Sequence, residues 1–466
     1  MTAIVAPVSA TRRTSRWLAL AARATFSVLI VGLPFRARID PLPHPASSVP
    51  AVLSDLVIYA IDVLAIAVLG LWLLARLLDR RPVALGPLAV RVPVAVLVVL
   101  AWITMPFGVE PVISVAGAIR LSLGVLLAVY VATEVDGLDS IAVPLGLMLA
   151  LQSVVAIWQA LTGGPIGLEA VGELRLDAEV PGTSVVMLGD GTRLLRAYGL
   201  SPHPNILGGI LACGLLLLLG IRTSTRAAGL AHRGIVLLAA VALLAAVALV
   251  ATFSRGAWLG ALAGLVAGFV VLAGVSDRRA LRTWGVSAAL AVAVAAAAGV
   301  AARDAVAART GLVPTLAPTE VRSVDERLEQ IRLGWRVVLD RPLTGSGASA
   351  LPIAMRDLEP DFAFAFYAPH LVPLAVAGEL GLAGGAAYLA TVGAPWLLLL
   401  RRRRLGLPIG LELAGASAAL AALTVASLFD DYPWVGGPGR TLGWLVIGLW
   451  VMAWARAERG GVGTAG

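Results

Sequence analysis

The side chains best suited to chemistry are arginines and histidines that stand beside long apolar runs. Arg255 interrupts the stretch ATFSRGAWLG, and His370 directly precedes the apolar run that begins LVPLAVAG. A guanidinium stays charged and matches phosphate oxygens in bidentate geometry, and a neutral imidazole can accept a hydroxyl proton. These residues point to chemistry at a phosphate-bearing substrate. The simpler alternatives are an arginine that reaches lipid headgroups and a histidine that caps a helix.

Further polar candidates are expected on the same side of the membrane as Arg255 and His370. They are Arg196, His203, Asn205, Arg322, Arg327, Arg332 and Arg336, with Glu379 inside the next span. Prolines flank His203 and fix the entry to a span, so a structural role is favoured for it. A structural role is also favoured for Asn205, which can cap that span. Glu379 is a functional candidate because ionisable residues are rare within spans, although it could simply hold helices together.

Two other clusters of ionisable residues are interpreted more plainly. Asp430 and Asp431 fall in an outer turn, where they could serve an acceptor, although solvation is the favoured expectation. The four histidines lack the spacing of metal ligands, so no metal and no other cofactor is expected.

The composition places these residues in a membrane protein. Of the 466 residues, 59% are hydrophobic and 14% are charged, whereas a soluble domain carries about 25% charged residues. Several runs approach or exceed the roughly 20 apolar residues that cross a bilayer. The sequence thus predicts an all-α integral membrane protein. The basic residues are all arginines and most occupy short loops, where they set orientation and do not indicate nucleic-acid binding.

The hydrophobic pattern predicts about twelve spans. They fall near 17–33, 52–75, 87–104, 112–132, 140–161, 204–221, 234–252, 256–274, 283–301, 371–400, 410–429 and 440–455. Arginines concentrate in alternate connections, which places both termini on the cytoplasmic side by the positive-inside rule. The first span is interpreted as a retained helix. Glycines 381, 384 and 385 predict a tilt or kink in the tenth.

The spans divide the chain into five parts. Residues 1–161 hold spans 1–5, residues 162–203 form an outer loop, and residues 204–301 hold spans 6–9. A larger outer loop covers 302–370, and spans 10–12 lie in 371–466. The first loop reads as a hairpin that turns at GDG. The second contains an amphipathic helix that ends at Asp340, before Pro342. Its expected apolar stripe is Val321, Val324, Leu328, Ile331, Trp335 and Val338.

Four stretches resemble the O-antigen ligase and O-antigen polymerase family of bacterial membrane proteins. They are RAYGLSPHPNILGG at 196–209, FSRGAWLG at 253–260, DERLEQIRLGWRVVLDRPLTGSG at 325–347 and PHLVPLAVAGELGLAGG at 369–385. They occur in the family's order and cover roughly 190–390. The resemblance departs from the family after His370, where HLVPL lacks the usual polar residue.

The resemblance implies a GT-C-like helical bundle and an inverting, metal-independent glycosyltransferase. It implies transfer of a glycan from undecaprenyl diphosphate to an acceptor hydroxyl, at the outer face of the bacterial cytoplasmic membrane. By motif, Arg255 and Arg327 would engage the diphosphate and His370 would be the essential histidine. Arg322 and Arg332 lie close enough to Arg327 that either could hold its role. The implied partners are the lipid-linked donor, a glycan or lipid-linked acceptor, and membrane lipids.

Two other classes of function remain open. Twelve spans with both termini inside also suit a secondary transporter, but such a protein should place polar residues near mid-membrane and show internal repeats. A non-catalytic protein that binds lipid diphosphates would keep the arginines and tolerate loss of His370. A ligase and a polymerase differ only in the acceptor, and the sequence does not separate them.

Overall fold

The structure is a computed structural model, and it describes residues 10–42, 49–50, 53, 56–180, 182–224, 232–275, 277–311, 318–407 and 409–462. It is an all-α bundle with two short hairpins. The long helices are α1 Ala10–Gly32, α3 Ala60–Asp79, α4 Leu88–Ile103, α5 Pro111–Glu134, α6 Ala142–Thr162, α7 Pro204–Thr223, α8 His232–Ala251, α9 Arg255–Ala273, α10 Arg278–Ala301, α14 Val372–Arg404, α15 Leu411–Ala426 and α16 Gly437–Val462.

Each of the twelve expected spans corresponds to one of these helices. Among the described residues, nine helices are long and apolar enough to cross a membrane. These are α1, α3, α5, α6, α7, α8, α9, α10 and α14, while α4 and α15 are apolar but shorter. The chain is therefore a multi-pass helical membrane protein, and the count of twelve spans stays a prediction.

The second span begins later than the sequence predicts. Strand β2 (Leu56–Tyr59) pairs antiparallel with β1 (Arg38–Leu42), and helix α3 starts only at Ala60. The four residues of β2 are Leu-Val-Ile-Tyr, and β-branched and aromatic residues of this kind suit an extended strand. Because they are also apolar, hydropathy alone merged them with the helix that follows.

Helix α7 lies at the centre of the bundle. It packs against α6, α8, α9, α10 and α15, and most of its side chains are buried. Gly220 of α7 and Gly415 of α15 meet so closely that a Cβ on Gly220 would lie 2.6 Å from the Cα of Gly415. Small residues allow this close approach. The resulting packing contacts hold the helices together, because the hydrophobic effect does not drive helices together inside a bilayer.

Helix α14 is broken near its first third, as the glycines predict. Gly381 has φ 75° and ψ 176°, outside the helical region. The segment after helix α12 (Pro318–Asp340) enters the break. There the amide of Ser346 donates to Gly378 O at 2.8 Å, and the amide of Leu382 donates to Pro342 O at 2.8 Å. The backbone groups freed by the break are thus paired within the protein, as a helix at membrane depth requires.

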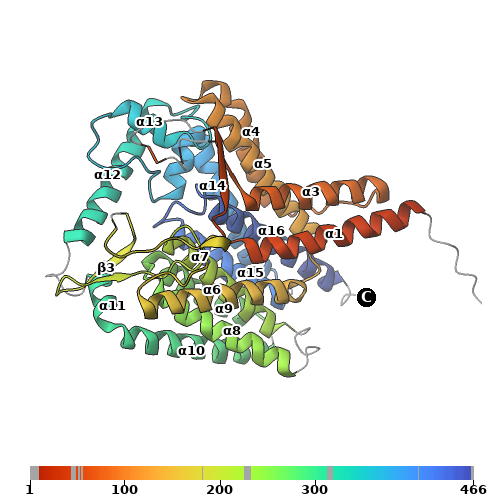
Figure 1. The fold of residues 1–466 in the computed structure, drawn as a ribbon. Helices are drawn as coiled ribbons and strands as arrows, with labels where there is room; N and C mark the ends of the chain where they lie inside the picture. The colour runs from red at the N-terminus through yellow and green to blue at the C-terminus, as the bar shows by residue number, and fades with distance from the viewer. Residues whose placement is uncertain are drawn as a thin grey trace, which may run out of the picture.

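The two long connections are folded and lie on one side of the bundle. The first holds the expected hairpin, in which β3 (Val185–Met187) pairs with β4 (Arg193–Leu195). The second holds α11 (Arg303–Thr310), α12 and α13 (Leu351–Leu358). Figure 1 shows β3, α11, α12 and α13 at the left, whereas the start of α1 and the end of α16 lie at the right. The loops and the ends of the described chain thus occupy opposite sides.

The helix expected in the second loop is present, but its packed face differs from the predicted stripe. Val324, Leu328 and Trp335 are exposed. Of the predicted stripe, Val338 is buried and Ile331 packs partly buried beside it; the other residues buried against the bundle are Gln330 and Leu333, both 0% exposed, with Val337. The spacing of the apolar residues placed the helix correctly. The face that packs on the bundle includes the buried Gln330, so it does not coincide with the most apolar line of the helix.

Candidate functional site

His370 lies directly before α14 and contacts α12. Its Nδ1 is 3.2 Å from Oε1 of Gln330. The amide nitrogen of Gln330 donates to Glu326 Oε1 at 3.2 Å and to Ala365 O at 3.4 Å, which fixes its oxygen toward the ring. That oxygen can only accept, so Nδ1 of His370 carries the proton and Nε2 of the neutral ring carries the lone pair.

Two aspartates from the turn between α15 and α16 approach the same ring. One ligand atom from each of His370, Asp430 and Asp431 lies within 4.8 Å of the others. Asp430 is only 7% exposed, so the expectation that it is solvated is wrong, whereas Asp431 is half-buried. The sequence shows two adjacent carboxylates immediately after a span, but this pattern does not indicate burial. Their burial depends on the ends of α7, α14 and α16.

The charges around His370 set its protonation. The pKa of His370 is lowered to about 4, mainly by burial; the Asp430 carboxylate opposes this shift, and the Arg327 cation adds to it. Burial also raises the pKa of Asp431 well above its usual range, and the neighbouring Asp430 adds to this rise. At neutral pH the cluster therefore presents a neutral imidazole, which is the form of histidine that can accept a proton.

A chain of hydrogen bonds fixes Asp430 in place. Nδ2 of Asn205 donates to Asp430 Oδ2 at 2.5 Å, and the guanidinium of Arg196 donates to Asn205 Oδ1 at 2.5 Å. Arg196, 4% exposed, also donates through Nε to Thr252 O at 2.8 Å. The structure thus joins Arg196 and Asn205 to the His370 cluster, although this arginine faces side-chain and backbone oxygens of the protein.

His203, and not Asn205, caps helix α7. Nδ1 of His203 accepts from the amide of Asn205 at 3.1 Å, which leaves its Nε2 to donate to Ser184 Oγ, also at 3.1 Å. Burial lowers the pKa of His203 well below its usual range, and the charges of Arg196, His370, Arg327 and Arg309 lower it further. These electrostatic neighbours show that the start of α7 borders the same cluster.

Arg255 begins helix α9 next to a second buried arginine. Its guanidinium donates to Arg309 O at 3.3 Å, and Nε of Arg309 donates to Phe253 O at 3.0 Å. Phe253 has φ 47°, an unusual backbone conformation for a side chain of this size. Arg309, which lies in α11 and is 6% exposed, was not among the sequence candidates. Little in the sequence distinguishes Arg309, because it lies in a loop with several other arginines.

The arginines of α12 fall into two groups. Arg327 lies one turn before Gln330 and acts electrostatically on His370, His203 and Asp431. Within the described residues, no carboxylate forms an ion pair with Arg327. Arg332 instead pairs with Glu329 at 2.6 Å and Glu359 at 2.9 Å. Arg336 also pairs with Glu359, so the structure places these two cations away from His370.

Two further candidates have other surroundings. Arg322 lies in the first turns of α12, and its side chain is outside the described residues. Glu379, 3% exposed in α14, accepts a hydrogen bond from Trp434 Nε1 at 2.9 Å. That contact joins α14 to the segment that precedes α16, which agrees with the alternative in which Glu379 holds helices together.

Residues 239–389 match the family model described as O-antigen ligase. This region is an O-antigen ligase domain. It contains the turn at Arg255, all of α12 and the start of α14 with His370. No curated protein matches the chain.

The O-antigen ligase assignment supports a membrane enzyme that transfers glycans in polysaccharide biosynthesis. Lipid-linked glycans and membrane lipids are the partners that this family implies. Arg196, Asn205 and Asp430 lie outside the matched region, yet they complete the surroundings of His370. The cluster around His370 is therefore built from the matched domain together with α7 and the turn before α16.

His370, Asp430 and Asp431 could together reach one metal ion, although hydrogen bonds already occupy part of this donor set. Both oxygens of Asp430 already accept hydrogen bonds, Oδ2 from Asn205 and Oδ1 from the amide of Asp431 at 3.2 Å. The Arg327 cation acts on the same group and opposes a second positive charge.

Proposed function

We propose that the protein transfers a glycan from undecaprenyl diphosphate to an acceptor hydroxyl, with inversion and without a metal. The observation that carries the proposal is a neutral His370, whose Nδ1 is bound to Gln330 so that Nε2 keeps the lone pair, near the cation of Arg327, which pairs with no carboxylate among the described residues. A base and an anion-binding group side by side are what attack on an anomeric carbon with loss of a diphosphate requires.

In the proposed reaction the acceptor oxygen attacks the anomeric carbon from the face opposite the diphosphate. The new C–O bond forms as the bond from carbon to the diphosphate oxygen breaks, which inverts the configuration. The hydroxyl proton passes to Nε2 of His370, and the departing electron pair stays on undecaprenyl diphosphate. Arg327 and Arg255 would stabilise that charge, with Arg309 as the neighbour that holds Arg255.

Asp430 has a supporting role in this scheme. When His370 takes up the proton it becomes a cation in a buried setting, which is costly without a nearby anion. The Asp430 carboxylate favours the charged ring, because it is the group that raises the pKa of His370. Its bond to Asn205 would hold it at the distance where this stabilisation acts.

We further propose that the reaction occurs at the outer face of the bacterial cytoplasmic membrane, with both termini inside. The side of the bundle that carries α11, α12 and α13 also carries His370 (Figure 1). The basic run Arg401–Arg404 ends α14, roughly 50 Å of helix from its start at 1.5 Å per residue. The positive-inside rule puts such a run in the cytoplasm and the other end of α14 outside.

The test is release of undecaprenyl diphosphate in vesicles that contain the purified protein, a glycan-loaded donor and a native envelope extract as acceptor. His370→Ala and Arg327→Ala should abolish or strongly reduce release, and a chelator should change nothing. An active His370→Ala protein would overturn the base assignment. If the donor binds but wild type releases no product with envelope extract, the protein is a lipid-diphosphate-binding protein and not a transferase. Extracts enriched in lipid A core or in free glycan would separate a ligase from a polymerase.

A further inference from the structure

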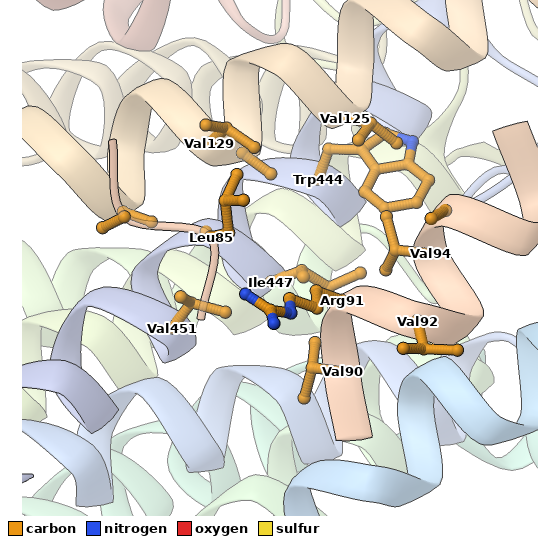
Figure 2. A pocket seen from close by; sticks show the side chains of 15 residues that line it. Leu85, Val90, Arg91, Val92, Val94, Val125, Val129, Trp444, Ile447 and Val451 are labelled. Carbon is orange, nitrogen blue, oxygen red and sulfur yellow. The ribbon is translucent and has the colours of Figure 1, made fainter. Parts of the chain in front are cut away.

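A cavity of about 350 Å³ opens between helices α4, α5 and α16, away from the His370 site. Its walls are apolar side chains and include Val90, Val129, Trp444 and Val451. Arg91 is the one charged residue among those that line it (Figure 2). The volume falls in the range of ligand sites, roughly 300–1,000 Å³, and the lining suits a hydrocarbon chain.

The inner wall of this cavity is a rigid contact between two helices. A Cβ on Gly448 of α16 would lie 2.7 Å from the carbonyl oxygen of Ala128 in α5. A Cβ on Gly124 would meet the Trp444 ring at 2.3 Å. Because no side chain fits between these helices at either point, the cavity keeps its shape and is not a gap that opens only by fluctuation.

The cation at this cavity has no protein partner among the described residues. Arg91 is exposed in the first turn of α4 and forms no ion pair or hydrogen bond with any described group. In Figure 2 its guanidinium lies between Leu85 and Val90, over the apolar wall. In contrast, Arg76, on the same side of the bundle, binds Glu134 and Pro82 O. The guanidinium of Arg91 is therefore available to bind an external anion.

The cavity and the His370 site lie toward opposite ends of α5. The start of α5 is beside Ser346, because the amide of Val109 donates to Ser346 O at 2.9 Å. The cavity residues Val125 to Ala132 occupy the last part of this helix, roughly 20 Å further at 1.5 Å per residue. The distance separates Arg91 from any diphosphate bound at Arg327, so Arg91 is not a further contact to the donor's phosphates.

We propose that this cavity is a specific site for an anionic phospholipid of the cytoplasmic leaflet. One acyl chain would fill the space between α4, α5 and α16, and the lipid phosphate would bind the guanidinium of Arg91. Basic pockets between spans on the cytoplasmic side recognise anionic headgroups in this way. The proposal rests on the membrane orientation proposed above, but it does not depend on the glycan-transfer chemistry, since it uses none of the residues of that site.

The experiment measures the affinity of the purified protein for a fluorescent phosphatidylglycerol and for the phosphatidylcholine with the same chains. Wild type should prefer the anionic lipid by about fivefold, the effect of roughly 1 kcal/mol for one arginine at the surface. Arg91→Leu should lose this preference. Arg81→Leu is the matched control, because Arg81 lies in the same connection but pairs with Asp79 at 2.5 Å.

A second variant tests the cavity itself. Val129→Trp fills the space and should weaken both lipids alike, while the protein still elutes as a folded species. Equal binding of the two lipids by wild type, or an Arg91→Leu protein that behaves like Arg81→Leu, would overturn the proposal. So would displacement of the bound lipid by undecaprenol to the same extent in wild type and Arg91→Leu, because the cavity would then hold an isoprenoid chain.

Discussion

Nδ1 of His370 lies 3.2 Å from Oε1 of Gln330, and this contact decides which ring nitrogen carries the proton and which keeps its lone pair. Gln330 is 0% exposed, and its amide nitrogen is held by Glu326 and Ala365. The glutamine therefore cannot turn to offer a donor to the ring without losing both bonds. A side chain that touches no substrate would in this way determine the direction of proton transfer.

Replacement of Gln330 tests this relationship. Gln330→Leu should lower kcat by about tenfold or more, because the ring loses the acceptor that fixes its tautomer and a buried N–H left unpaired costs about 1–3 kcal/mol. Gln330→Glu keeps an acceptor and should restore much of the rate. The new carboxylate also favours the charged ring, so the acid limb of the pH profile should move to higher pH. If Gln330→Glu leaves that limb where it is, the two side chains do not interact during catalysis.

The pH dependence of the wild-type reaction is a separate prediction. Burial lowers the pKa of His370 to about 4, so the ring stays neutral as the pH falls through 6.5, where an ordinary histidine gains its proton. Glycan transfer should then remain constant from pH 8 to about 5 and fall only below that. The measurement is kcat/KM for undecaprenyl diphosphate release across this range. An acid limb near 6.5 would mean that His370 is more solvated than its position indicates.

The same shift makes a prediction about stability. In the unfolded chain His370 binds a proton near pH 6.5, whereas in the folded protein it does so only near 4. Between these values the unfolded state holds more protons, so stability decreases as the pH falls through this window. His370→Asn should flatten the dependence of Tm on pH between 6.5 and 4. An unchanged slope would assign the acid sensitivity to other groups, such as His203.

The sequence predicted the helical bundle well because hydropathy is a local property. Each of the twelve expected spans corresponds to a helix, and both loop motifs were located correctly. The start of α3 was wrong, because an apolar strand and an apolar helix look alike to hydropathy. The packed face of α12 also differed, since the most apolar line of a helix need not be the line that contacts the bundle.

The surroundings of His370 were harder to predict because they come from four distant segments. Asn205 and Asp430 are 225 residues apart in sequence but share a 2.5 Å hydrogen bond. Nothing in the local sequence around Asp430 indicates burial. The motif resemblance singled out His370, Arg255 and Arg327, but it could not indicate Gln330 or Arg309, whose contacts depend on which helix face meets which turn.

Arg327 and Arg332 provide a matched test of the anion-binding role. Both lie on α12, but Arg327 acts on His370, whereas Arg332 is held by Glu329 and Glu359. Arg327→Ala should reduce kcat by about 10²–10³-fold if it stabilises charge on the leaving diphosphate. Arg332→Ala should change the rate by less than about fivefold, because an exposed ion pair contributes at most about 1 kcal/mol. Equal losses in both variants would show that α12 binds the donor along its exposed face.

Gly381 and Gly393 test how the break in α14 supports the site, since both glycines lie in this helix. At Gly381 the backbone has φ 75°, and an added Cβ would lie 2.4 Å from Leu343 O. Gly381→Ala should therefore destabilise the protein by at least about 1–3 kcal/mol, the usual range for such backbone strain. It should also displace the 342–347 segment that precedes α13.

At Gly393 no atom lies within 4 Å of an added Cβ, so Gly393→Ala should leave Tm unchanged or raise it slightly. Thermal unfolding in detergent, followed with glycan transfer, would distinguish the two variants. A Gly381→Ala protein with wild-type Tm and activity would show that the break can close without affecting the turn that carries His370.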